Sequence, residues 1–87
     1  MLNNEQKVVW IIGGSGGIGS HIARRMSDNG WKVIISARDI EKLHEVSNYG
    51  SIEAIVLDAT DADEVQSKAV EISKKYGSLD AVVNSVG

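Results

Sequence analysis

The chain contains no cysteine, so it forms no disulfide, no thiolate metal site and no C-x-x-C redox pair. Long apolar runs are absent as well. The first apolar run, Val8–Ile12, follows a polar start and is too short for a signal-peptide core or a membrane span. Neither absence points to export or to a membrane, and we therefore expect a cytoplasmic protein.

The chain also lacks a strong excess of charge of one sign. Its net charge is −3 over 87 residues, with acidic and basic side chains interspersed, which argues against a general nucleic-acid or membrane-surface binder. No internal repeat, low-complexity segment or linker interrupts it. With 43% hydrophobic and 24% charged residues, the chain is typical of a globular protein. Residues 1–87 therefore fit one small domain or part of a larger one.

Glycine is concentrated in one place. Five of the nine glycines lie between Gly13 and Gly19, directly after the apolar run and before a helical spacing of Ile18, Ile22 and Met26. A strand, a glycine turn and a helix start together form a phosphate site, because glycine permits close backbone approach and the helix offers free N–H groups. Three registers fit: G-x-G-x-x-G, G-x-x-x-G-x-G and G-x-x-G-x-x-G. The alternative is a tight turn that binds no ligand.

Apolar runs alternate with helical segments along the rest of the chain. The predicted strands are Lys7–Ile12, Lys32–Ser36, Glu53–Leu57 and Leu79–Asn84. The predicted helices are Gly17–Asn29, a short one capped by Asp39 with Ile40, Leu43 and Val46 on one side, and one between Asp61 and Gly77 that opens with an Asp61–Glu64 capping box.

Strands that are apolar on both faces indicate a buried parallel sheet. The sequence therefore predicts an α/β fold, half of a doubly wound Rossmann-type sheet. Right-handed crossovers would place the first two helices on one face and the third on the other, with strand order 3-2-1-4.

Arg38 lies 19 residues after Gly19, where dinucleotide folds place the residue that contacts the adenosine ribose. An acid there binds the 2′-hydroxyl of NAD, whereas an arginine accommodates the 2′-phosphate of NADP. Ala37 occupies the position expected for the acid, and Ser36 would add a hydroxyl donor to the phosphate. We therefore predict NADP, with NAD less favoured. The alternative is an ordinary surface arginine.

Asp58 follows the third predicted strand and has two interpretations. It would either accept a hydrogen bond from the adenine amino group or serve as a turn residue before the next helix. No metal site is expected, because His21 and His44 fall on separate predicted helices without a third ligand. Trp10 and Trp31 lie in or beside predicted strands and are interpreted as packing residues.

These motifs together resemble the N-terminal third of a short-chain dehydrogenase/reductase. The family's T-G-x-x-x-G-I-G turn is matched from Ile12 to Gly19, its acid after the third strand by Asp58, and its N-N-A-G segment by Asn84 to Gly87. The turn Gly19-Ser20-His21 also resembles the extended, epimerase-like branch, but the segment from Asn84 to Gly87 favours the family's common single-domain form. The resemblance implies hydride transfer between a nicotinamide and a carbonyl or alcohol. The cofactor-binding residues it implies are Gly13, Ser15, Gly17, Ile18, Gly19, Ser36, Arg38, Asp58, Ala59, Asn84 and Gly87.

The chain departs from the family in two ways. Ile12 replaces the family threonine, and Ser85 and Val86 replace asparagine and alanine. More important, the family's catalytic Ser and Tyr-x-x-x-Lys are absent, since Tyr49 and Tyr76 are followed by acids at the lysine position. We therefore expect no catalytic residue here and suspect an incomplete domain.

The alternative to the oxidoreductase is a non-catalytic, truncated dinucleotide-binding or self-associating module. The fourth predicted strand carries apolar residues and neither proline nor lysine, so we expect homo-oligomers through this strand. The residues concerned are Leu79, Ala81, Val82 and Val83.

Overall fold

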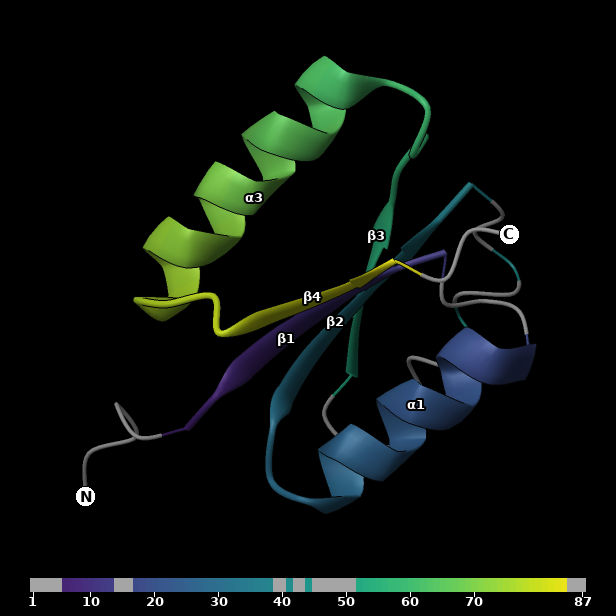
Figure 1. Ribbon diagram of the computed structural model, residues 1–87, viewed down its shortest axis with the longest axis vertical. Helices are drawn as coiled ribbons and strands as arrows, with labels where there is room; N and C mark the ends of the chain where they lie inside the picture. The colour runs from purple at the N-terminus through teal and green to yellow at the C-terminus, as the bar shows by residue number, and fades with distance from the viewer. Residues whose placement is uncertain (1–5, 14–16, 39–40, 42–43, 45–51, 85–87) are drawn as a thin grey trace.

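The computed structural model describes residues 6–13, 17–38, 41, 44 and 52–84. They form a four-stranded parallel sheet with the order β3-β2-β1-β4, flanked by helices (Figure 1). This confirms the predicted α/β fold and strand order. The elements are β1 (Val8–Ile12), α1 (Gly17–Asp28), β2 (Lys32–Ala37), β3 (Ile52–Val56), α3 (Ala62–Tyr76) and β4 (Ala81–Asn84).

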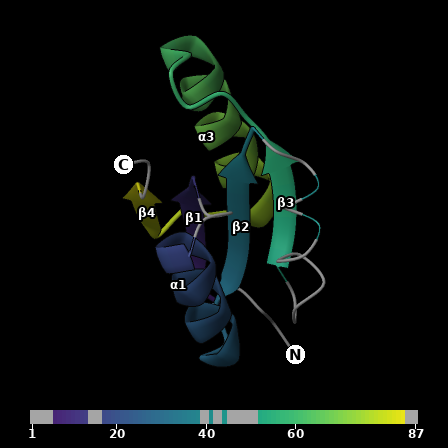
Figure 2. The same cartoon turned by 90° about the vertical axis from the view of Figure 1, so that its right-hand side faces the viewer.

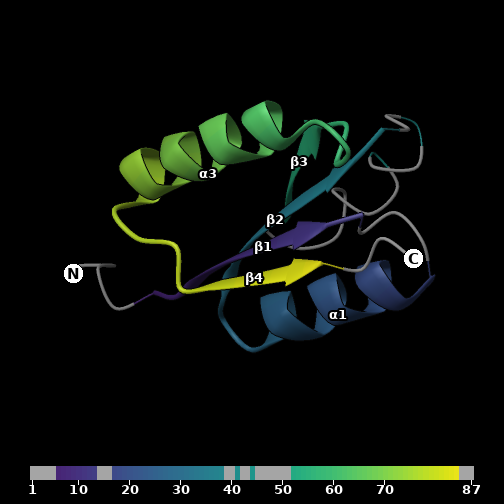
Figure 3. The same ribbon diagram turned by 45° about the horizontal axis from the view of Figure 1, so that its top comes forward.

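The two helices lie on opposite faces of the sheet (Figures 2 and 3). Successive side chains of a strand point to opposite faces, so β1 and β2 each contribute to two cores. The core under α1 contains Val9, Ile11, Ala23, Val33, Ile35 and Ile52. The core under α3 contains Val8, Trp10, Ile12, Ile34, Leu57 and Ile72. The opposite placement of the first and third helices is therefore confirmed.

Between β2 and β3 the structure describes Arg38, Glu41 and His44, of which Glu41 and His44 are in helical conformation. The predicted cap at Asp39 and the apolar residues Ile40, Leu43 and Val46 lie outside the described residues. The side of the sheet that this predicted helix covers therefore stays a prediction.

Helix α3 begins and ends as predicted, with one difference. Asp61 is the N-cap and accepts a hydrogen bond from the Glu64 N–H at 3.1 Å, and Gly77 ends the helix with a φ of 81°. The Glu64 carboxylate does not return to Asp61, however. It accepts the N–H of Asp58 at 3.1 Å, because Asp61 already donates its own N–H to the Asp58 carbonyl at 3.0 Å. The capping box therefore extends back to the end of β3.

Some strand boundaries differ from the predictions by one or two residues. Strand β4 begins at Ala81 rather than Leu79. The reason lies at Asp80, whose carboxylate Oδ2 accepts the Val8 N–H at 2.8 Å while its own N–H donates to the Val8 carbonyl at 2.9 Å. A side-chain oxygen thus takes the place of a backbone carbonyl, and regular pairing of β4 with β1 begins one residue later.

Candidate functional site at the carboxyl edge of the sheet

Several of the residues that the sequence singled out come together at one edge of the sheet. All four strands are parallel, so their carboxyl ends meet there. Gly13 follows β1, Arg38 follows β2, Asp58 lies two residues beyond β3, and Asn84 is the last residue of β4. In the strand register, Ile12 pairs with Ser36 on one side and with Asn84 on the other.

The turn after β1 begins with a backbone conformation that favours glycine. Gly13 has a φ of 81°, in the left-handed region that other residues rarely adopt. Its N–H donates to the Ser36 carbonyl at 2.6 Å, so the turn stays attached to β2. Helix α1 begins at Gly17, and Gly17, Ile18 and Gly19 form the start of this helix, with Gly19 buried. Ser15 lies outside the described residues.

Ser36 has a different environment from the one expected. Its side chain is completely buried, and its hydroxyl accepts the indole N–H of Trp10 at 2.7 Å. A hydroxyl covered in this way does not reach a phosphate in solvent, so we correct the expectation of a phosphate contact. Ser36 instead satisfies a buried donor, which would otherwise cost free energy. Trp10 is a packing residue of the α3-side core, as predicted.

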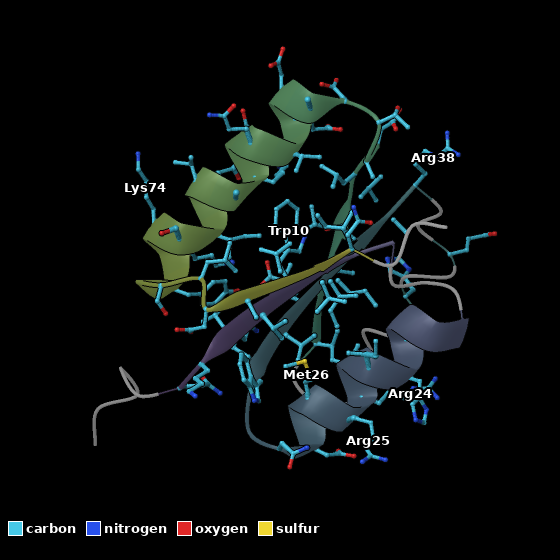
Figure 4. All side chains as sticks on the ribbon, viewed as in Figure 1. Trp10, Arg24, Arg25, Met26, Arg38 and Lys74 are labelled. Carbon is cyan, nitrogen blue, oxygen red and sulfur yellow. The ribbon has the colours of Figure 1, made fainter. Side chains whose placement is uncertain are left out.

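Arg38 is exposed directly after β2 and projects from the carboxyl edge of the sheet (Figure 4). Lys74 lies at the other end of the molecule, near the carboxyl end of α3 (Figure 4). The backbone next to Arg38 is fixed, since the Ala37 carbonyl accepts the Leu57 N–H at 2.9 Å. This hydrogen bond brings the residues that follow β2 and β3 side by side.

Asp58 is partly buried and forms a tight turn with Thr60. Its Oδ1 accepts the Thr60 N–H at 3.0 Å and the Thr60 hydroxyl at 2.7 Å. The Thr60 hydroxyl and then the Thr60 N–H lower the pKa of the Asp58 carboxyl. Desolvation opposes them, and the positive charge of Arg38 lowers the pKa with the smallest of these effects. The turn interpretation of Asp58 is thus confirmed, and the adenine interpretation stays a prediction. Ala59, the next residue, packs against the α3-side core.

Asn84 is exposed at the end of β4, and Ser85 to Gly87 lie outside the described residues. Within the part of the chain that the structure describes, no group of three or more potential metal ligands gathers. No helix in that part is long and apolar enough to cross a membrane.

Sequence reasoning missed two contributors to this edge. Thr60 was detectable, because Asp58-Ala59-Thr60 is a spacing at which an aspartate accepts from the backbone two residues on. The Trp10–Ser36 hydrogen bond joins residues 26 positions apart, and only the strand register brings them onto the same face.

Comparison with known proteins extends this picture. A family model described as short chain dehydrogenase matches residues 7–87. An uncharacterized oxidoreductase of Staphylococcus saprophyticus is 32% identical over 100% of this chain and 40% of its own length. Another, of Bacillus subtilis, is 35% identical over 94% of this chain and 13% of its own length. The chain thus spans two fifths or less of these two relatives.

Solved structures show the same arrangement of elements. The actinorhodin polyketide ketoreductase with NADPH superposes with a TM-score of 0.88 at 26% identity, over 100% of this chain and 35% of that protein. A metagenomic short-chain oxidoreductase in complex with NADP gives a TM-score of 0.85 at 32% identity, over 93% of this chain and 39% of that protein. With the family model matching all but the first residues, this chain belongs to the short-chain dehydrogenase family.

Proposed function

We propose that this chain binds NADP(H) and forms the cofactor-binding portion, residues 1–87, of a short-chain oxidoreductase. The observation that carries the proposal is the exposed Arg38 at the end of β2, one strand away from the positive-φ turn at Gly13. The nicotinamide would exchange a hydride with a carbonyl or alcohol of the substrate. The residues described here bind and orient the cofactor.

The residues at the carboxyl edge fit the separate parts of a dinucleotide. The turn at Gly13 and the start of α1 would bind the pyrophosphate through backbone N–H groups, with Ser15 in the same turn. Asp58, beside Ala59, would accept from the adenine amino group. Asn84 and Gly87 would lie along the ribose on the nicotinamide side. Ser36 is left out, because its hydroxyl is buried.

The choice of NADP over NAD rests on charge. An arginine at the end of β2 offers a planar cation with paired donors for a 2′-phosphate, whereas an acid would be needed to hold a 2′-hydroxyl. Arg38 is exposed and lies close enough to Asp58 to lower the pKa of its carboxyl. The NADPH and NADP in the two solved structures above support the same choice.

We place no catalytic group in these residues. Tyr76 lies at the carboxyl end of α3, away from the candidate site, and donates its hydroxyl hydrogen to Glu53. The residue four positions after it is Asp80 rather than lysine. We therefore assign Tyr76 no acid–base role in the proposed reaction.

Calorimetric titration with NADPH and NADH tests the proposal. We expect tighter binding of NADPH. Arg38→Asp should weaken NADPH binding by about tenfold to a hundredfold, as expected for the loss of hydrogen bonds between charged groups worth about 1.5–3 kcal/mol. NADH binding should not weaken, because the new acid can hold the 2′-hydroxyl of NADH, so the preference for NADPH should be erased or reversed. Added salt should narrow the difference between the cofactors in the unmodified chain. Lys74→Asp makes the same change of charge away from the candidate site and is the matched control. Equal affinities for the two cofactors in the unmodified chain would contradict the proposal.

A further inference from the structure

Three of the four hydrogen-bonding groups of Asp58 already have partners. Its N–H donates to Glu64 Oε1 at 3.1 Å, and its carbonyl accepts the Asp61 N–H at 3.0 Å. Its Oδ1 accepts both the N–H and the hydroxyl of Thr60, at 3.0 and 2.7 Å. The other carboxylate oxygen, Oδ2, accepts no hydrogen bond from the residues that the structure describes. The turn therefore leaves one defined acceptor on this side chain.

The two bonds from Thr60 have two separate effects. Because both donors bind the same oxygen, they restrict rotation of the carboxylate and distinguish its two oxygens. They also favour the ionised form, which accepts hydrogen bonds and donates none. An ionised oxygen held in this way attracts an amino group and repels a carbonyl oxygen. Adenine carries an amino group at its C6 position, and hypoxanthine carries a carbonyl there.

We propose that Thr60 is a positioning residue that holds Asp58 so that Oδ2 accepts the exocyclic amino group of adenine, giving the site a preference for adenine over hypoxanthine. This inference rests on the proposed function, since it concerns the base of the bound dinucleotide. Glu64 supports the arrangement from α3 by holding the Asp58 backbone. Rejection of hypoxanthine follows from the unpaired acceptor that the wrong base would leave.

A purely structural role for Thr60, in the turn before α3, predicts a different result. In that case removal of the hydroxyl would destabilise the chain and weaken the binding of the adenine and hypoxanthine dinucleotides equally. The preference between bases separates the two roles. Thr60→Val keeps the side-chain shape and the backbone N–H but removes the hydroxyl. Thr60→Ala also keeps the backbone N–H and removes the hydroxyl, with a smaller side chain. Thr60→Ser keeps the hydroxyl and serves as the rescue variant.

The experiment measures binding of NADP⁺ and of its hypoxanthine analogue to each chain, with circular dichroism to check folding. The unmodified chain and Thr60→Ser should prefer NADP⁺ by roughly tenfold, the discrimination expected from the loss of one hydrogen bond to a charged group. Thr60→Val and Thr60→Ala should reduce the preference to within about twofold. In the ligand-free chain, NMR titration of the Asp58 carboxyl should show its pKa rising toward the ordinary value in both variants.

The outcomes separate this inference from the proposed function. A full preference for NADP⁺ in folded Thr60→Val or Thr60→Ala would overturn the role of Thr60 and leave the cofactor site intact. Absence of NADP⁺ binding to the unmodified chain would overturn the proposed function and the adenine contact with it. An unchanged pKa of Asp58 in both variants would show that Thr60 does not hold the carboxylate.

Discussion

Glu53 is a partly exposed carboxylate on β3 that links three elements. Its oxygens lie 3.8 Å from the Lys32 amino group of β2 and 3.3 Å from the Lys75 amino group of α3. The Tyr76 hydroxyl of α3 also donates to it. Both lysines lie over the Tyr76 ring, at 5.4 and 5.3 Å from its centre. These contacts attach the carboxyl end of α3 to the sheet.

This arrangement predicts how stability responds to acid. Burial raises the pKa of Glu53, but the hydrogen bonds from Tyr76 and Lys75 and the charges of Lys75 and Lys32 together lower it below 4.5. A lowered folded-state pKa stabilises the fold above the unfolded value of 4.5, and this contribution disappears as pH falls through the folded value. The contribution should be modest, about 0.5–1 kcal/mol, because the groups are partly in solvent.

Urea unfolding at pH 7 and pH 3 checks this prediction. The loss of stability on acidification should be smaller in Glu53→Gln than in the unmodified chain. Glu71→Gln, which removes an exposed carboxylate paired with Lys68 alone, should leave the loss nearly unchanged. An equal acid sensitivity in Glu53→Gln and the unmodified chain would rule out the proposed contribution.

Single residues also show where sequence reasoning reaches its limit. The position of Arg38 at the end of β2 followed from its spacing to the glycine cluster. The burial of Ser36 did not, because β2 is apolar on both faces and its pattern does not indicate whether a small polar residue near its end is covered. In the structure, Ser36 shares a face with Ile34, and therefore lies in the core under α3. Its partner Trp10 comes from another strand, which a local pattern cannot show.

At the scale of elements, β4 is less covered than β2, the other strand that pairs with β1. Strand β2 is covered on both faces, whereas Val82 in the middle of β4 is 52% exposed. Within the described residues β4 forms one edge of the sheet, and it carries no lysine or proline to discourage pairing with another chain. We propose that this edge mediates self-association, as the sequence led us to expect.

Light scattering over a dilution series tests self-association. The unmodified chain should show a mass above the monomer that falls on dilution, and Val82→Lys should shift it to the monomer. Val70→Lys introduces the same side chain at a similarly exposed valine, 48%, on the outer side of α3, and should leave the mass unchanged. A monomer at every concentration, or equal effects of the two substitutions, would contradict association through β4.

At the scale of the whole molecule, the alternation of apolar runs and helical segments was enough to predict the order of the sheet. Parallel strands with right-handed crossovers leave few arrangements, and a glycine turn after the first strand locates the carboxyl edge. The Asp58–Thr60 turn at that edge could be detected from its spacing, but other hydrogen bonds there could not. The bond from Asp58 to Glu64 depends on which donors the N-cap Asp61 leaves available, and this is decided only when the turn has folded.

In our proposal this carboxyl edge binds a nicotinamide dinucleotide, and an NMR titration of the isotope-labelled chain with NADPH would locate that binding residue by residue. We expect saturable changes in the backbone amide signals of Gly13, Gly19, Arg38 and Asp58, which follow three different strands at one edge of the sheet. The amides of Lys74 and Gly77, at the carboxyl end of α3, should remain unchanged. Saturable changes confined to the carboxyl end of α3, or no saturable change at any concentration, would contradict the account.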